Sequence, residues 1–154
     1  MTIGEISQRH GGITVAAFVV LLVGLCALGA ADTVVAPGGV DLSCSRLQAT
    51  QAGALSLSYI NSVTGYKITV MADIGTGTPV ANALLSIKGG DIGSYASLIV
   101  GSDPVATRTL RSNVPAETGV IDDIYLKLDA SGVAAGAANL GTAWTYTLTY
   151  TLGP

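Results

Sequence analysis

The sequence predicts an all-β fold, a single antiparallel β-sandwich of jelly-roll or Ig-like type, preceded by one N-terminal hydrophobic helix or signal segment. From Val40 onward, strand-favouring residues alternate with small polar ones, the spacing that places neighbouring side chains on opposite faces of a strand. Clusters of Gly, Pro, Asn and Asp interrupt this pattern at short intervals. Before it, Ile13–Leu28 is a continuous apolar run. We therefore expect two regions, residues 1–31 and a sandwich domain of residues 32–154.

The clearest strand is the last one. Trp144–Leu152 alternates large apolar or aromatic residues with threonine, and both classes favour strands. We expect one face of this strand to enter the core, with Trp144 at least partly buried, and the threonine face to meet solvent or a neighbour.

Weaker versions of the same pattern predict further strands, with a long loop or one helical turn in the Ala- and Gly-rich stretch 130–141 before the final strand. About eight short strands at this spacing are typical of a sandwich or a barrel. The other predicted strands are Val40–Leu47, Ala54–Ile60, Tyr66–Met71, Ala83–Ile87, Tyr95–Val100, Ala106–Leu110 and Ile121–Leu128.

The N-terminal segment has the layout of a secretory signal. A polar stretch carrying Arg9 and His10 precedes the apolar run, and small residues follow it before Asp32. The run is shorter than the roughly 20 residues that span a bilayer. This favours cleavage near residue 30 or 31. The alternative is retention, with residues 13–36 forming one apolar helix in a membrane or in a filament core.

Composition limits the partners. The chain has 154 residues, 49% of them hydrophobic and 11% charged, whereas a soluble domain carries roughly 25% charged residues. Polar Ser, Thr, Asn and Gln solvate strands without the charge density that opposes close subunit packing, which suits a polymer. With a net charge of −3 and scattered cations, we expect no nucleic-acid partner.

The exported region lacks the residues of common catalytic sites. His10 is the one histidine of the chain and precedes the apolar run, so a Ser-His-Asp or Cys-His hydrolase is excluded. Asp122 and Asp123 are adjacent in a predicted strand and would point to opposite faces. Cys26 and Cys44 have no metal-type spacing. We predict no catalytic, cofactor-binding or metal-binding residues and no enzyme activity.

A short stretch after the apolar run resembles a known family. Thr33–Ser43, with the sequence TVVAPGGVDLS, is similar to the start of mature TasA/camelysin-type proteins. In that family and in similar archaeal bundling pili, the resemblance implies jelly-roll-like subunits joined by donor-strand exchange, in which one subunit's N-terminal strand fills a groove of the next. Under this reading the inserted apolar residues, and the candidate polymerisation site, are Val34, Val35, Val40 and Leu42.

A second resemblance concerns the apolar run itself. Arg9-His10-Gly11-Gly12 is similar to the sites that prepilin peptidases cut, and residues 12–32 resemble the single helix of Tad-type pilus proteins. Thr2 and Glu5 match the start of type IV pilins, although polar residues 7–10 interrupt that likeness. Residues 1–31 would then be a pilin-like hydrophobic helix instead of an export signal.

These observations predict a structural, pilin-like subunit of an extracellular filament at the cell surface. Its partner would be a second copy of the chain in a homopolymer, with transient membrane contact during export. Polymerisation would use the N-terminal segment, by donor-strand exchange or by helix packing. The alternative function is that of a monomeric, surface-exposed binding, adhesin or coat module.

Overall fold

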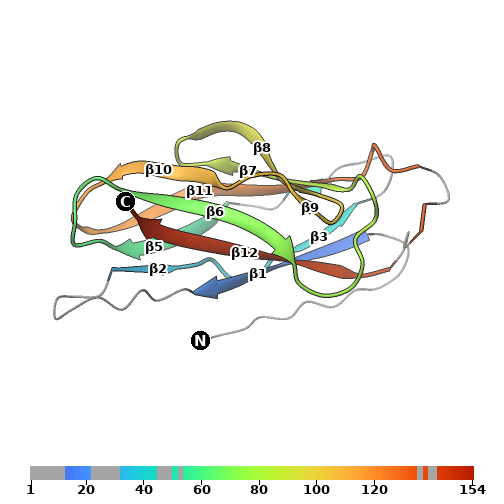
Figure 1. Ribbon diagram of the computed structural model, residues 1–154, viewed down its shortest axis with the longest axis horizontal. Helices are drawn as coiled ribbons and strands as arrows, with labels where there is room; N and C mark the ends of the chain where they lie inside the picture. The colour runs from blue at the N-terminus through green and yellow to red at the C-terminus, as the bar shows by residue number, and fades with distance from the viewer. Residues whose placement is uncertain (1–12, 22–31, 45–49, 52–53, 135–136, 139–141) are drawn as a thin grey trace.

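The computed structural model describes residues 13–21, 32–44, 50–51, 54–134, 137–138 and 142–154 (Figure 1). Every regular element in these residues is a β-strand, which confirms the all-β prediction. The strands are β1 (Ile13–Leu21), β2 (Thr33–Val35), β3 (Asp41–Cys44), β4 (Thr50–Gln51), β5 (Leu55–Ile60), β6 (Tyr66–Ile74), β7 (Leu84–Gly89), β8 (Ile92–Val100), β9 (Asp103–Pro104), β10 (Arg108–Val114), β11 (Thr118–Asp129) and β12 (Trp144–Gly153).

The strands form two sheets that enclose one apolar core (Figure 1). A five-stranded sheet has the order β10-β6-β12-β1-β3, and a seven-stranded sheet has the order β2-β5-β11-β7-β8-β9 with β4 also paired to β11. Among the described ladders, the pair of β1 and β12 is parallel and the others are antiparallel. The largest fully buried side chains come from both sheets and include Trp144, Tyr146, Leu42, Leu57, Ile68, Leu85, Ile87 and Leu126.

Each segment predicted as a strand from residue 40 onward overlaps a strand of the structure, although several observed strands are longer than predicted. Four short or early strands, β1, β2, β4 and β9, were not predicted. In the stretch 130–141, residues 130–134 form a turn and loop, while residues 135–136 and 139–141 lie outside the described part. The predicted N-terminal helix is not tested, because residues 1–12 and 22–31 also lie outside it; between them, residues 13–21 form β1.

Strand β12 has the alternating environment that its sequence predicts. Trp144, Tyr146, Leu148 and Tyr150 are buried, which confirms the expectation for Trp144, while the threonines at 147, 149 and 151 are more exposed. The Tyr146 hydroxyl donates a hydrogen bond to the carbonyl oxygen of Gly101 at 2.9 Å, so this phenol is buried with a partner. The buried aromatic side chains of β12 therefore form part of the core between the two sheets.

The β7–β8 hairpin depends on two glycines. Gly89 and Gly90 have φ values of 133° and 55°, a region that L side chains rarely adopt. A Cβ atom at Gly89 would collide with the backbone oxygen of Asp123 in β11, and one at Gly90 with the backbone oxygen of Leu110 in β10. The pair allows the hairpin to approach the backbones of both sheets closely.

Candidate functional site

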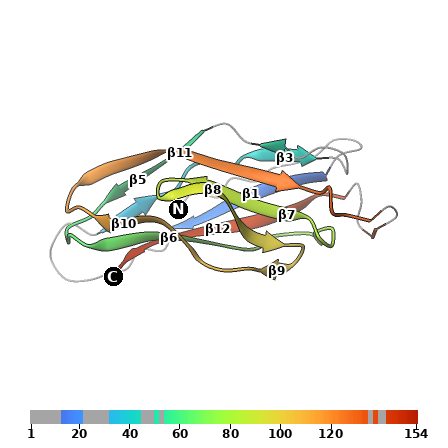
Figure 2. The same cartoon turned by 90° about the horizontal axis from the view of Figure 1, so that it is seen from above.

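The feature with the clearest functional content is an internal strand position in the five-stranded sheet. Strand β1 lies between β12 and β3 (Figure 2). Its ladder with β12 runs from the pair of Val15 and Trp144 to the pair of Leu21 and Tyr150, and its ladder with β3 from Ile13 and Cys44 to Ala16 and Asp41. We call the position between residues 144–150 of β12 and 41–44 of β3 the β12/β3 slot.

The slot joins segments that are distant in sequence. Residues 13–21 pair with residues 144–150, so no hairpin connects the two strands. Parallel neighbours cannot be joined by a tight turn, and β1 lies beside β12 through its backbone ladder. The geometry of the slot therefore does not depend on a short covalent connection between β1 and β12.

The slot accepts a strand with a defined pattern. Positions 15, 17, 19 and 21 of β1 are the register partners of Trp144, Tyr146, Leu148 and Tyr150, all of which are buried. Positions 18 and 20 are the register partners of Thr147 and Thr149, both of which are partly exposed. Paired residues of neighbouring strands lie on the same face of a sheet. A strand in this position must therefore be apolar at every second residue.

An empty slot would be costly. The edge of β12 that faces β1 would present unpaired backbone N–H and C=O groups at alternate residues between 144 and 150. Strand β3 would lose β1, which is its ladder partner among the described strands of that sheet. An apolar strand at this position, here β1, therefore satisfies the backbone groups of both neighbours.

The four predicted polymerisation residues do not form one row. Val34 is buried in β2, the edge strand of the seven-stranded sheet, and its neighbour Val35 is 59% exposed. Val40 is half-buried just before β3, and Leu42 is buried within β3 of the other sheet. In the single chain, Val34 and Val35 therefore lie in one sheet and Leu42 in the other, with Val40 just before β3. Their role as a strand donated to a second copy stays a prediction.

Sequence reasoning did not identify residues 13–21 as an internal strand of the domain. The segment reads ITVAAFVVL, in which Ile, Thr and Val are β-branched and favour strands. This composition was the available signal, but a continuous apolar run also suits a signal or a membrane helix.

The chain matches no protein-family model, and no curated protein matches its sequence. Within the described residues, no helix is long and apolar enough to cross a bilayer.

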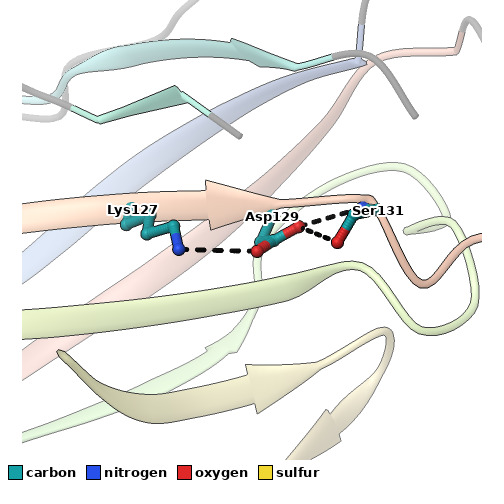
Figure 3. Close-up of polar contacts among 3 residues, drawn as sticks. All are labelled: Lys127, Asp129 and Ser131. Carbon is teal, nitrogen blue, oxygen red and sulfur yellow. Dashed lines mark hydrogen bonds and ion pairs between the residues drawn. The ribbon is translucent and has the colours of Figure 1, made fainter. Parts of the chain in front are cut away.

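Two acidic residues of the described region, Asp129 and Asp91, each accept two hydrogen bonds from one serine. Asp129 accepts hydrogen bonds from the backbone N–H of Ser131 at 2.9 Å and from its hydroxyl at 2.6 Å, and its other oxygen lies 3.5 Å from Nζ of Lys127 (Figure 3). Asp91 likewise accepts from the backbone N–H and hydroxyl of Ser112, at 2.7 and 2.6 Å. In the described residues, no three His, Cys, Asp or Glu side chains are grouped so as to hold a metal ion.

These hydrogen bonds should make the stability of the fold depend on pH in the acidic range. The donors from Ser131 and Ser112 lower the pKa of Asp129 and of Asp91 below the ordinary value of 3.8. A carboxyl group with a lowered pKa in the folded state stabilises the fold above its unfolded pKa, and this contribution is lost as pH falls through the folded pKa. We expect the melting temperature to drop between about pH 5 and pH 2, and the drop to be smaller in the Asp91→Asn, Asp129→Asn double variant.

Thermal unfolding followed by circular dichroism across this pH range tests the expectation. The Ser112→Ala, Ser131→Ala variant, which removes only the hydroxyl donors, should show an intermediate dependence because the backbone donors remain. A double asparagine variant with the full pH dependence of the unchanged protein would assign acid sensitivity to other groups.

Proposed function

We propose that this protein is a structural subunit of an extracellular filament, and that its subunits are joined by strand complementation at the β12/β3 slot. The observation that carries the proposal is the slot itself, an internal sheet position filled by an apolar segment from the opposite part of the sequence. Under this proposal the domain is a jelly-roll or Ig-like sandwich that is complete only when the slot is occupied.

A strand in the β12/β3 slot has to meet two requirements, which are backbone pairing and burial of apolar side chains. A strand from a second copy satisfies the backbone groups of β12 and β3 and at the same time covers the apolar row that begins at Trp144. The donating segment and the accepting slot are different surfaces, so the contact is heterologous. Heterologous contacts that do not close into a ring produce open polymers.

The surface supports close packing of subunits. Val35 and Val120 are 59% and 54% exposed, and both pair with Ser58 of β5, so they lie at one level across β2, β5 and β11. Exposed apolar groups next to uncharged polar ones oppose association less than a charged surface does.

The alternative function, a monomeric surface-exposed binding, adhesin or coat module, would use an open surface. A flat aromatic platform is the usual device for stacking sugars, but the tyrosines on the outer face of the seven-stranded sheet are accompanied by cations. Nζ of Lys88 lies 5.6 Å from the ring centroid of Tyr125, and Nζ of Lys127 lies 5.7 Å from that of Tyr95. This arrangement favours the filament over a sugar-binding platform.

Negative-stain electron microscopy and sedimentation of the exported full chain test the proposal. We expect filaments composed of this chain, and a soluble fraction that shifts to filaments as concentration rises. Excess peptide with the sequence of residues 13–21 should compete for the slot and shorten the filaments, whereas a scrambled peptide should not. A protein that stays monomeric at every concentration would reject the filament function and favour the binding module.

A further inference from the structure

We propose that the strand donated between subunits is Ile13–Leu21 itself, so that β1 of one copy fills the β12/β3 slot of the next. This inference rests on the proposed filament function and names the donor segment, the acceptor and their direction, which is parallel to β12. It differs from the sequence-based prediction, in which Thr33–Leu42 supplies the donor strand.

The first support is the fit of this segment to the slot. Residues 15–21 pair without a register shift along Trp144–Tyr150, and residues 13–16 pair with β3 on the other side. Any contact that a segment makes within its own chain can be made identically with a second copy, which is the principle of domain swapping. The register seen in one chain is therefore also the register expected between two chains.

The second support is the anchoring of the competing segment. The Asp32 carboxylate accepts a hydrogen bond from the backbone N–H of Ser62 at 2.6 Å, and β2 pairs with β5. Val34 and Leu42 are buried in the core of their own domain. Donating residues 33–42 would detach strands of both sheets, β2 and β3, from their own domain, whereas donating β1 detaches one strand and leaves Val34 and Leu42 in place.

The third support is reach. Residues 22–31 separate β1 from the first strand of the seven-stranded sheet in the sequence. About ten residues span up to roughly 33–36 Å when fully extended, enough to carry a strand from one small domain to a neighbour in contact with it. The proposal requires that residues 13–21 remain on the mature chain, which is the alternative to cleavage near residue 30 or 31.

A cross-linking experiment separates exchange between copies from pairing within one chain. Val20 and Thr149 are register partners. In chains whose Cys26 and Cys44 are replaced by serine, Val20→Cys is introduced into one tagged chain and Thr149→Cys into a differently tagged one. Assembled mixtures should form a disulfide between the two tags on oxidation. Val20→Cys mixed with Ser58→Cys, which lies on the other sheet, is the matched control and should not cross-link.

Two charge variants test the pattern of the slot. Position 19 is the register partner of buried Leu148, and position 20 that of the more exposed Thr149. The yield of filaments should be at least about tenfold lower for Val19→Asp than for Val20→Asp. The reason is that a charge opposite a buried partner excludes the strand from the slot. Both variants place the same charge in the apolar run, so an effect on export alone would reduce both equally.

The mass of the subunits in isolated filaments completes the test, and we expect it to include residues 13–21. Filaments whose subunits begin after residue 31 would overturn this inference and leave the filament function intact, with residues 33–42 as the next donor to consider. A double variant with Val20→Cys and Thr149→Cys in one chain tests pairing within a chain. A disulfide in this variant, with none between the two differently tagged chains, would overturn the inference as well, since β1 would then stay in its own chain. Absence of filaments from the unchanged protein would overturn both proposals.

Discussion

Replacing Trp144 with alanine is expected to lower the free energy of unfolding by about 3–5 kcal/mol, a large part of the stability of a small domain. The Trp144 side chain is 1% exposed at the start of β12, and its ring meets that of Tyr146 edge to face with centroids 6.4 Å apart. Alanine would leave a cavity where the indole fills the core and would remove this aromatic contact. Urea unfolding followed by circular dichroism measures the loss.

Trp144→Phe is the matched control. The indole Nε1 is buried and has no hydrogen-bond partner among the described residues, so phenylalanine removes an unsatisfied donor and keeps a ring. The cost should be on the order of 1–2 kcal/mol, because the remaining cavity is small. Equal losses for alanine and phenylalanine would mean that the indole nitrogen has an essential partner.

The second large effect is expected at Asn61, a side chain that is 3% exposed in the turn after β5. Its amide nitrogen donates to the carbonyl oxygens of Val63, Val114 and Pro115, at 2.7, 3.1 and 2.9 Å. Asn61 therefore ties the turn after β5 to the end of β10. Asn61→Ala leaves these carbonyl groups without that donor and should cost about 2–3 kcal/mol.

Asn61→Asp should be worse than alanine at neutral pH. A carboxylate would face the same three carbonyl oxygens with no donor, and burial would raise the pKa of the new group. Its penalty should therefore shrink as pH falls and the carboxyl group is protonated, opposite to the acid loss expected from Asp91 and Asp129. Ser62→Ala, on an exposed neighbouring side chain, should change the free energy of unfolding by less than about 0.5 kcal/mol. An aspartate variant as stable as the unchanged protein would show that Asn61 does not act through its donors.

The importance of Asn61 could not be predicted from the sequence. An asparagine in a turn is ordinarily solvated. Only the tertiary arrangement brings the carbonyl groups of residues 114 and 115 within reach of its amide. The placement of Val34 and Leu42 in different sheets could not be predicted from the sequence either. The two residues are eight positions apart, and the sequence does not indicate which strand each segment pairs with.

The sequence by itself determined where the domain's main strands and turns lie. The alternation in Trp144–Leu152 is a local property, because a strand with one buried face needs an apolar residue at every second position. The pair Gly89-Gly90 is a local signal too, because glycine readily adopts the positive φ values found in this hairpin. Only the tertiary structure decided the position of residues 13–21. A continuous apolar run has no period that distinguishes a helix from a strand buried on both faces, so its conformation depends on the partner it meets. Here that partner is the edge of β12, more than a hundred residues away along the chain, where residues 144–150 pair with β1 and the side chains of Trp144, Tyr146, Leu148 and Tyr150 are buried.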